Sequence, residues 1–141
     1  MVAYLDSSVL LRAILSDDSA IDQTRQLPVF SSELLEIECR RAIFRDRSTG
    51  QLDDPKFLRA LKRLQTYLEE TELVEIDGGI KRRAMEAFPV HVKTLDALHL
   101  ATALAIESQG ESVVMFSFDQ GMNRAARALG MAAPWYHSDD P

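Results

Sequence analysis

The stretch VAYLDSSVLL, residues 2–11, decides how this chain begins to fold. Residues 2–5 form a short apolar run that is typical of a buried strand, and a helix is predicted to begin at the two serines that follow. Asp6 stands between the two elements, where the strand ends. A carboxylate in that position either caps the following helix, a role that aspartate fills readily, or belongs to a functional site.

The rest of the chain repeats this alternation of strand and helix. Further strands are predicted at residues 28–31, 73–76 and 113–118, with a fifth candidate at 132–136. Helices are predicted at residues 7–14, 20–26, 33–47, 55–70, 80–88, 95–108 and 122–129. This order favours an α/β fold with a central, mainly parallel sheet of four to five strands, which binds ligands beyond the carboxyl ends of its strands. No repeat or linker divides the chain, so we expect a single domain over residues 1–141.

Composition bounds the class of protein. Hydrophobic residues make up 46% of the chain, enough for a core. No run of about 18 apolar residues is present, so no membrane span is expected. The start lacks a basic segment followed by an apolar one, so no secretion leader is expected either. Cys39 is the single cysteine, which excludes an internal disulfide and fits a reducing compartment. We therefore expect a soluble, cytoplasmic protein.

The charge of the chain is acidic. Sixteen Lys and Arg residues against 22 Asp and Glu residues give a net charge of −6, which argues against binding nucleic acid through overall charge. Basic residues nevertheless gather at positions 40–47, 56–63 and 81–83. Solvated helix faces are the ordinary explanation of such clusters, yet local basic strips permit a contact with RNA or with an acidic partner.

Two more acids stand out as functional candidates. Asp119 follows an apolar strand and precedes a helix, as Asp6 does, and it is equally suited to cap that helix. Glu38 falls on the face of its predicted helix that is expected to pack inward. A buried acid needs a partner or a metal, or it must be neutral, so Glu38 is a candidate ligand. The alternative is that its tip reaches water, Arg41 or Arg45.

The predicted helix at residues 95–108 carries the fourth acid. This helix is apolar nearly all round, as in buried helices, apart from Asp96, His99 and a threonine. With Thr94 as N-cap, Asp96 lies in the first turn, where the helix dipole already favours negative charge. His99, one turn on, is placed to bond Asp96 or a substrate phosphate, although a buried histidine satisfied by a backbone carbonyl is the commoner arrangement.

Each acid alone has a structural explanation, but four converging acids would need a cation. Two carboxylates about 4 Å apart repel by roughly 4 kcal/mol at an effective dielectric constant of 20. Oxygen ligands suit Mg²⁺ or Mn²⁺, and no Cys and His set with zinc spacing is present. Such a site supports phosphodiester hydrolysis. The predicted metal-binding and catalytic residues are Asp6, Glu38, Asp96 and Asp119.

Taken together, the motifs resemble those of the PIN-domain ribonucleases and, within them, the VapC-type toxins of toxin–antitoxin pairs. Four stretches carry the resemblance and follow the family's order across almost the whole chain. They are YLDSSVLL (4–11), SSELLEIECRRA (31–42), TLDALHLATA (94–103) and FSFDQGMNRAARALGM (116–131).

The resemblance implies a three-layer α/β/α fold, a homodimer and an endoribonuclease that depends on Mg²⁺ or Mn²⁺ and cuts tRNA or ribosomal RNA. It also implies a cognate antitoxin whose C-terminal segment covers the active site. The four acids correspond to the family's metal-binding residues. Ser8 and Ser117 match hydroxyl residues near the first and last acid, and His99 is a further supporting candidate.

Other readings of the first acid fit less well. Haloacid-dehalogenase-like phosphatases need a second aspartate two residues after the first, where this chain has Ser8. Response-regulator receivers need a lysine after a late strand, and none follows Lys93. A PIN-like domain that binds RNA or a protein partner without catalysis stays open, and it predicts that Asp6→Asn changes no cellular effect.

Overall fold

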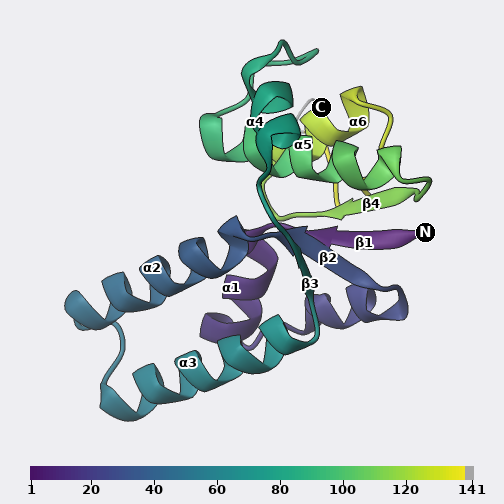
Figure 1. The fold of residues 1–141 in the computed structure, drawn as a ribbon. Helices are drawn as coiled ribbons and strands as arrows, with labels where there is room; N and C mark the ends of the chain where they lie inside the picture. The colour runs from purple at the N-terminus through teal and green to yellow at the C-terminus, as the bar shows by residue number, and fades with distance from the viewer. Residues whose placement is uncertain (139–141) are drawn as a thin grey trace.

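The structure is a computed structural model that describes residues 1–138, which form a parallel sheet flanked by helices (Figure 1). The strands are β1 (Val2–Leu5), β2 (Val29–Ser32), β3 (Glu72–Val74) and β4 (Val113–Phe116). The helices are α1 (Ser7–Ser16), the 3-10 helix η1 (Ser19–Gln26), α2 (Leu34–Ser48), α3 (Asp54–Glu69), α4 (Gly78–Met85), α5 (Thr94–Ser108) and α6 (Gln120–Ala128).

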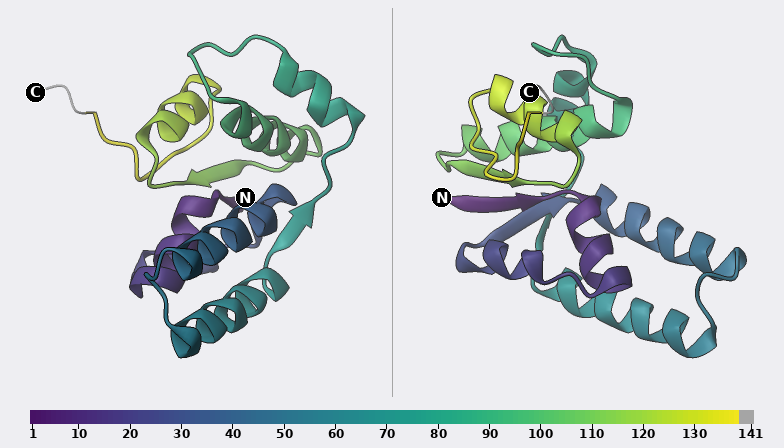
Figure 2. Two further views of the ribbon diagram at one scale, coloured as in Figure 1. Left: turned by 90° about the vertical axis from the view of Figure 1, so that its left-hand side faces the viewer. Right: turned by 180° about the vertical axis from the view of Figure 1, so that it is seen from behind.

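The sheet has the order β3-β2-β1-β4, and every pairing in it is parallel. Helices α1, α2 and α3 lie on one side of it, and α4, α5 and α6 lie on the other (Figures 1 and 2). The predicted three-layer α/β/α fold is therefore confirmed. Because Leu5 of β1 pairs with Phe116 of β4, the residues that follow these two, Asp6 and Ser117, emerge at the same edge of the sheet.

Side chains of the central strands alternate between two cores. Ala3 and Leu5 of β1 pack with α1, α2 and α3, while Val2 and Tyr4 pack with α5 and α6. β4 alternates in the same way. Strands covered on both faces are apolar throughout, which explains the short continuous apolar runs of the sequence. Within residues 1–138, no helix has both the length and the apolarity that a membrane crossing requires.

Several predicted boundaries were wrong. Residues 132–136 form no fifth strand but a single bridge between Ala132 and Val114, and Pro134 has no N–H to extend it. β4 ends at Phe116 rather than 118, because the next residues turn toward the end of β1 and the N–H of Phe118 bonds there to a side chain. The helix predicted at 20–26 is the 3-10 helix η1. The ends of the other predicted helices agree to within three residues.

Candidate active site

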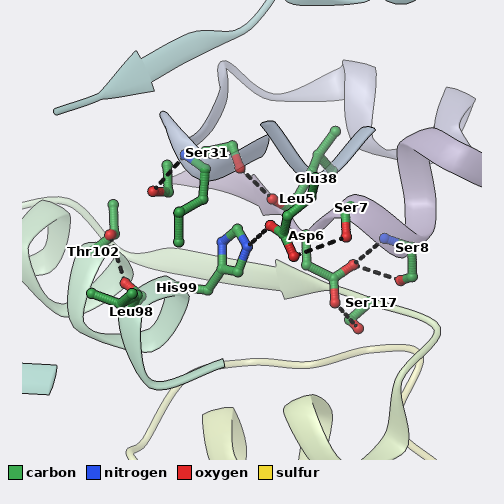
Figure 3. Close-up of polar contacts among 12 residues, drawn as sticks. Leu5, Asp6, Ser7, Ser8, Ser31, Glu38, Leu98, His99, Thr102 and Ser117 are labelled. Carbon is green, nitrogen blue, oxygen red and sulfur yellow. Dashed lines mark hydrogen bonds and ion pairs between the residues drawn. The ribbon is translucent and has the colours of Figure 1, made fainter. Parts of the chain in front are cut away.

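Asp6 lies at the carboxyl end of β1 and is nearly buried, with 5% exposure. It caps α1, since Oδ1 accepts a hydrogen bond from the backbone N–H of Ser8 at 3.1 Å. The same carboxylate accepts from two hydroxyl groups, Ser8 Oγ at Oδ1 and Ser117 Oγ at Oδ2, each at 2.5 Å (Figure 3). The capping role allowed by the sequence is therefore real, but it engages Oδ1 alone.

Backbone N–H groups set the direction of both serine hydroxyls. Ser8 Oγ accepts from the N–H of Phe118, and Ser117 Oγ accepts from the N–H of Asp119, each at 2.9 Å. Because a hydroxyl carries one proton, each serine that accepts from the backbone can turn that proton toward Asp6. Oδ2 of Asp6 then accepts one hydrogen bond and keeps a lone pair that is available to a cation.

Asp119 is exposed and caps α6, as the sequence indicated. Its Oδ1 accepts from the N–H of Gly121 at 2.9 Å and from that of Met122 at 3.4 Å. Within residues 1–138, Oδ2 of Asp119 accepts no hydrogen bond. As at Asp6, capping uses one carboxylate oxygen and leaves the other available.

Asp96 lies in the first turn of α5 and is half-buried. The predicted N-cap Thr94 was wrong, because the helix already begins at Thr94 and Lys93 occupies the cap position without a side-chain hydrogen bond. Among the described residues, none donates a hydrogen bond to the carboxylate of Asp96, so this partly buried charge has no donor to compensate it.

Carboxylates of these three aspartates raise the pKa of Asp6 and Asp96. Burial is the main cause that raises the pKa of Asp6, the charge of Asp119 adds to it, and hydrogen bonds from Ser117 and Ser8 act in the opposite direction. Burial also raises the pKa of Asp96, followed by the charges of Asp119 and Asp6. We call these three residues the acidic centre. A divalent cation would remove the repulsion, and carboxylate oxygens suit Mg²⁺ and Mn²⁺, so these residues fit such an ion in charge and in donor type.

Glu38 lies on the inward face of α2, as predicted, but it is engaged by a histidine. Its Oε1 lies 2.6 Å from Nε2 of His99, and its Oε2 accepts a long hydrogen bond of 3.4 Å from Ser7 Oγ (Figure 3). Neither Arg41 nor Arg45 pairs with Glu38 among the described residues, so the arginine part of the alternative was wrong, while the side chain, 20% exposed, does reach solvent. The expected backbone carbonyl partner of His99 was also wrong, because its ring bonds side chains.

Two residues that bond this group were not identified from the sequence. Tyr4 is fully buried, and its hydroxyl lies 2.7 Å from Nδ1 of His99. Burial raises the pKa of Tyr4 above its ordinary value, so the phenol stays protonated. The available signal was a tyrosine within a short buried strand, because a buried phenol requires a polar partner. The second residue is Ser7, for which the sequence predicted only the start of a helix.

The four acids do not form one ready-made ligand set. Within residues 1–138, no three His, Cys, Asp or Glu side chains lie close enough to hold a metal ion. The acidic centre and the pair of Glu38 with His99 are separate groups, although the electrostatic effect of His99 lowers the pKa of both Asp6 and Asp96. Metal ligation by these four acids therefore stays a prediction.

A cavity of about 730 Å³ lies elsewhere. It is lined by α4, the segment that follows it and the start of α5, including Met85, Phe88, Val92 and Leu98. None of the four acids lines this cavity. A functional assignment based on this cavity would therefore miss the acids.

Comparison with known proteins identifies the family. Residues 3–128 match the PIN domain. The chain is 31% identical to ribonuclease VapC35 of Mycobacterium tuberculosis over 135 residues, which cover 92% of this chain and 93% of that protein. It is 29% identical to ribonuclease VapC46 of the same organism over 133 residues, with the same coverage.

Solved structures share the fold. One is the crystal structure of VapBC2 from Rickettsia felis bound to a DNA fragment from the VapBC2 promoter. It aligns with a TM-score of 0.66 at 12% identity, over 89% of this chain and 93% of that one. PAE2754 from Pyrobaculum aerophilum aligns with a TM-score of 0.62 at 20% identity, over 94% and 90% of the two chains. The parallel sheet, the acids at its carboxyl edge and the relatives lead to one conclusion: the chain belongs to the PIN-domain family and is of the VapC type.

Proposed function

We propose that this chain is the toxin of a toxin–antitoxin pair and cleaves RNA as an endoribonuclease that depends on Mg²⁺ or Mn²⁺. The observation that carries the proposal is the acidic centre at the carboxyl edge of the sheet, where the charge of Asp119 raises the pKa of both Asp6 and Asp96. Its support is the 31% identity to a ribonuclease over nearly the whole chain. Transfer RNA and ribosomal RNA are the proposed substrates.

Each acid has a proposed role that follows from a carboxylate oxygen with a lone pair available to a cation. Asp6 and Asp119 would hold the cation through Oδ2, and Asp96 would hold it through a carboxylate that accepts no hydrogen bond among residues 1–138. Glu38 would bind the cation or orient the attacking water through Oε2. A divalent cation supplies Lewis-acid polarisation of the phosphodiester and makes water more acidic.

The remaining groups orient these acids and the RNA. The hydroxyls of Ser8 and Ser117 donate to Asp6 and so favour its ionised form. Arg41 and Arg45 follow Glu38 by three and seven positions on α2, on the same side of the helix, and would hold RNA phosphates in this proposal. Because water rather than a 2′-hydroxyl is the proposed nucleophile, the products should carry 5′-phosphate and 3′-hydroxyl ends.

We also propose a cognate antitoxin and a homodimer. The solved VapBC2 structure pairs a protein of this fold with its VapB partner, which supports the first. The second is supported by apolar side chains that α2 exposes to solvent, Ile37 at 54% and Phe44 at 52%. The single cysteine agrees with action in the cytoplasm, and the family match from residue 3 to residue 128 agrees with one domain.

One observation favours an alternative, a PIN-like domain that binds RNA or a partner without catalysis. It is the absence of a preassembled ligand set among the described residues. The test incubates the purified, antitoxin-free chain with total tRNA and ribosomal RNA in Mg²⁺, in Mn²⁺ or in EDTA, beside Asp6→Asn. Asp53→Asn, a helix cap on α3, serves as the control. Discrete fragments that require metal and Asp6 support the enzyme, whereas RNA binding without cleavage in either metal supports the alternative.

A further inference from the structure

A buried hydrogen-bonded chain runs from β1 through α5 to α2. The hydroxyl of Tyr4 lies 2.7 Å from His99 Nδ1, and His99 Nε2 lies 2.6 Å from Glu38 Oε1. Tyr4 is fully buried, and the side chains of His99 and Glu38 are 1% and 20% exposed. These hydrogen bonds therefore connect the interior of the domain to a carboxylate that reaches solvent.

Donor and acceptor roles determine which nitrogen of His99 carries the proton and how its ring is oriented between Tyr4 and Glu38. An ionised carboxylate can only accept, so Nε2 of His99 carries the proton that bonds Glu38. In the neutral ring Nδ1 then accepts, and the hydroxyl of Tyr4 is its donor. The rings of Tyr4 and His99 also meet edge to face, with centroids 5.8 Å apart and planes at 83°. With both nitrogens engaged and the ring buried, the imidazole has one orientation.

We infer that His99, oriented by Tyr4, is a positioning residue that holds Glu38 by Oε1 and leaves Oε2 for a cation or a water molecule. Among residues 1–138, Oε2 accepts only the 3.4 Å hydrogen bond from Ser7, which a stronger ligand can replace. This inference rests on the proposed function, because it assigns the support of one of the proposed ligands.

Holding Glu38 in advance has an energetic consequence. A solvent-exposed glutamate samples several rotamers, and ordering a long side chain costs conformational entropy. His99 imposes that order before a cation or RNA arrives, so binding does not have to supply it. The link also crosses between the two helical layers, since α2 and α5 lie on opposite sides of the sheet (Figure 1). A histidine that only filled the core would not need a partner on the opposite layer.

The test measures the Mn²⁺ affinity of the full chain without RNA, from the electron paramagnetic resonance signal of free Mn²⁺. Tyr4→Phe removes one hydroxyl, and Tyr67→Phe makes the same change on α3 as the control. We expect Tyr4→Phe and His99→Phe to weaken affinity by about 10- to 100-fold. His99→Gln retains an N–H donor for Glu38 and should stay within about threefold of the wild type. Thermal melting in EDTA verifies that each variant is folded.

The outcomes separate this inference from the proposed function. Wild-type Mn²⁺ affinity in folded Tyr4→Phe and His99→Phe overturns the positioning role. If Asp6→Asn loses Mn²⁺ binding in the same experiment, the proposed metal site is still supported. If His99→Phe does not fold, Tyr4→Phe and His99→Gln decide, and equal affinity in the two overturns the inference. A wild-type chain that binds no Mn²⁺ overturns both the proposed metal site and the inference.

Discussion

Two substitutions at Asp119 separate its role as a helix cap from its proposed role as a ligand. Oδ1 accepts from the N–H groups of Gly121 and Met122, at 2.9 and 3.4 Å, while Oδ2 is the proposed ligand atom. Asp119→Asn keeps an oxygen for the cap but loses the charge. Asp119→Ala loses both, so the pair of variants distinguishes capping from charge.

The expected loss of stability in Asp119→Ala follows from the loss of the helix cap. Replacing a capping aspartate by alanine costs about 1 kcal/mol, whereas asparagine caps equally well. For a chain of 141 residues this corresponds to about 3 to 4 °C in melting temperature. Both variants also remove the charge that raises the pKa of Asp6 and Asp96, so the difference between the variants measures the cap. In EDTA, Asp119→Asn should melt at or above the wild-type temperature.

The assay compares melting in EDTA with RNA cleavage in Mn²⁺. Asp119→Asn should cleave at least about 100-fold more slowly, because loss of a ligand should exceed the effect of an outer-sphere change. Asp53→Ala is the matched control, since Asp53 caps α3 through the N–H of Lys56 at 2.9 Å. It should lower the melting temperature and leave cleavage unchanged. Wild-type cleavage by folded Asp119→Asn would refute the reasoning and reduce Asp119 to a cap.

Three further predictions concern the same centre. Ser117→Ala removes a donor to Asp6 and the acceptor of a backbone N–H, and should destabilise the chain by about 1 to 3 kcal/mol in thermal melts; unchanged stability would contradict the bonding described. The folded-state pKa of Asp6 is raised above its ordinary 3.8, so the penalty of burying its charge grows as pH rises above 3.8 and is complete above the raised pKa. In EDTA, Asp6→Asn should therefore gain stability over the wild type across that window, and a difference that does not vary with pH would count against burial as the cause. Mn²⁺ at a hundredfold excess over its dissociation constant should stabilise the wild type by about 2.7 kcal/mol, and an equal shift in Asp96→Asn at the same concentration would exclude Asp96 as a ligand.

Local chemistry made much of the fold predictable. The strand at residues 2–5 is apolar because both faces are covered, and Asp6 and Asp119 cap helices where the sequence indicated. The inward position of Glu38 also followed from helical periodicity. These features depend on neighbours within a few residues, which a single sequence contains.

Features that depend on distant partners were not predictable. Glu38 bonds His99, 61 residues away, rather than a nearby arginine, and that choice is decided by how α2 and α5 pack across the sheet. The hydrogen bond between Tyr4 and His99 joins residues 95 positions apart and likewise depends on tertiary packing. Residues 132–136 had the composition of a strand, but they make one bridge and then meet a proline.

The ends of the RNA fragments test the central claim most directly. Wild-type chain and Asp6→Asn would be incubated with end-labelled RNA in Mn²⁺, and the fragments probed for 5′-phosphate and 3′-hydroxyl groups. The account predicts both groups on wild-type products, no cleavage in EDTA and none by Asp6→Asn. Fragments with 2′,3′-cyclic phosphate ends, or cleavage that persists in Asp6→Asn, would contradict it.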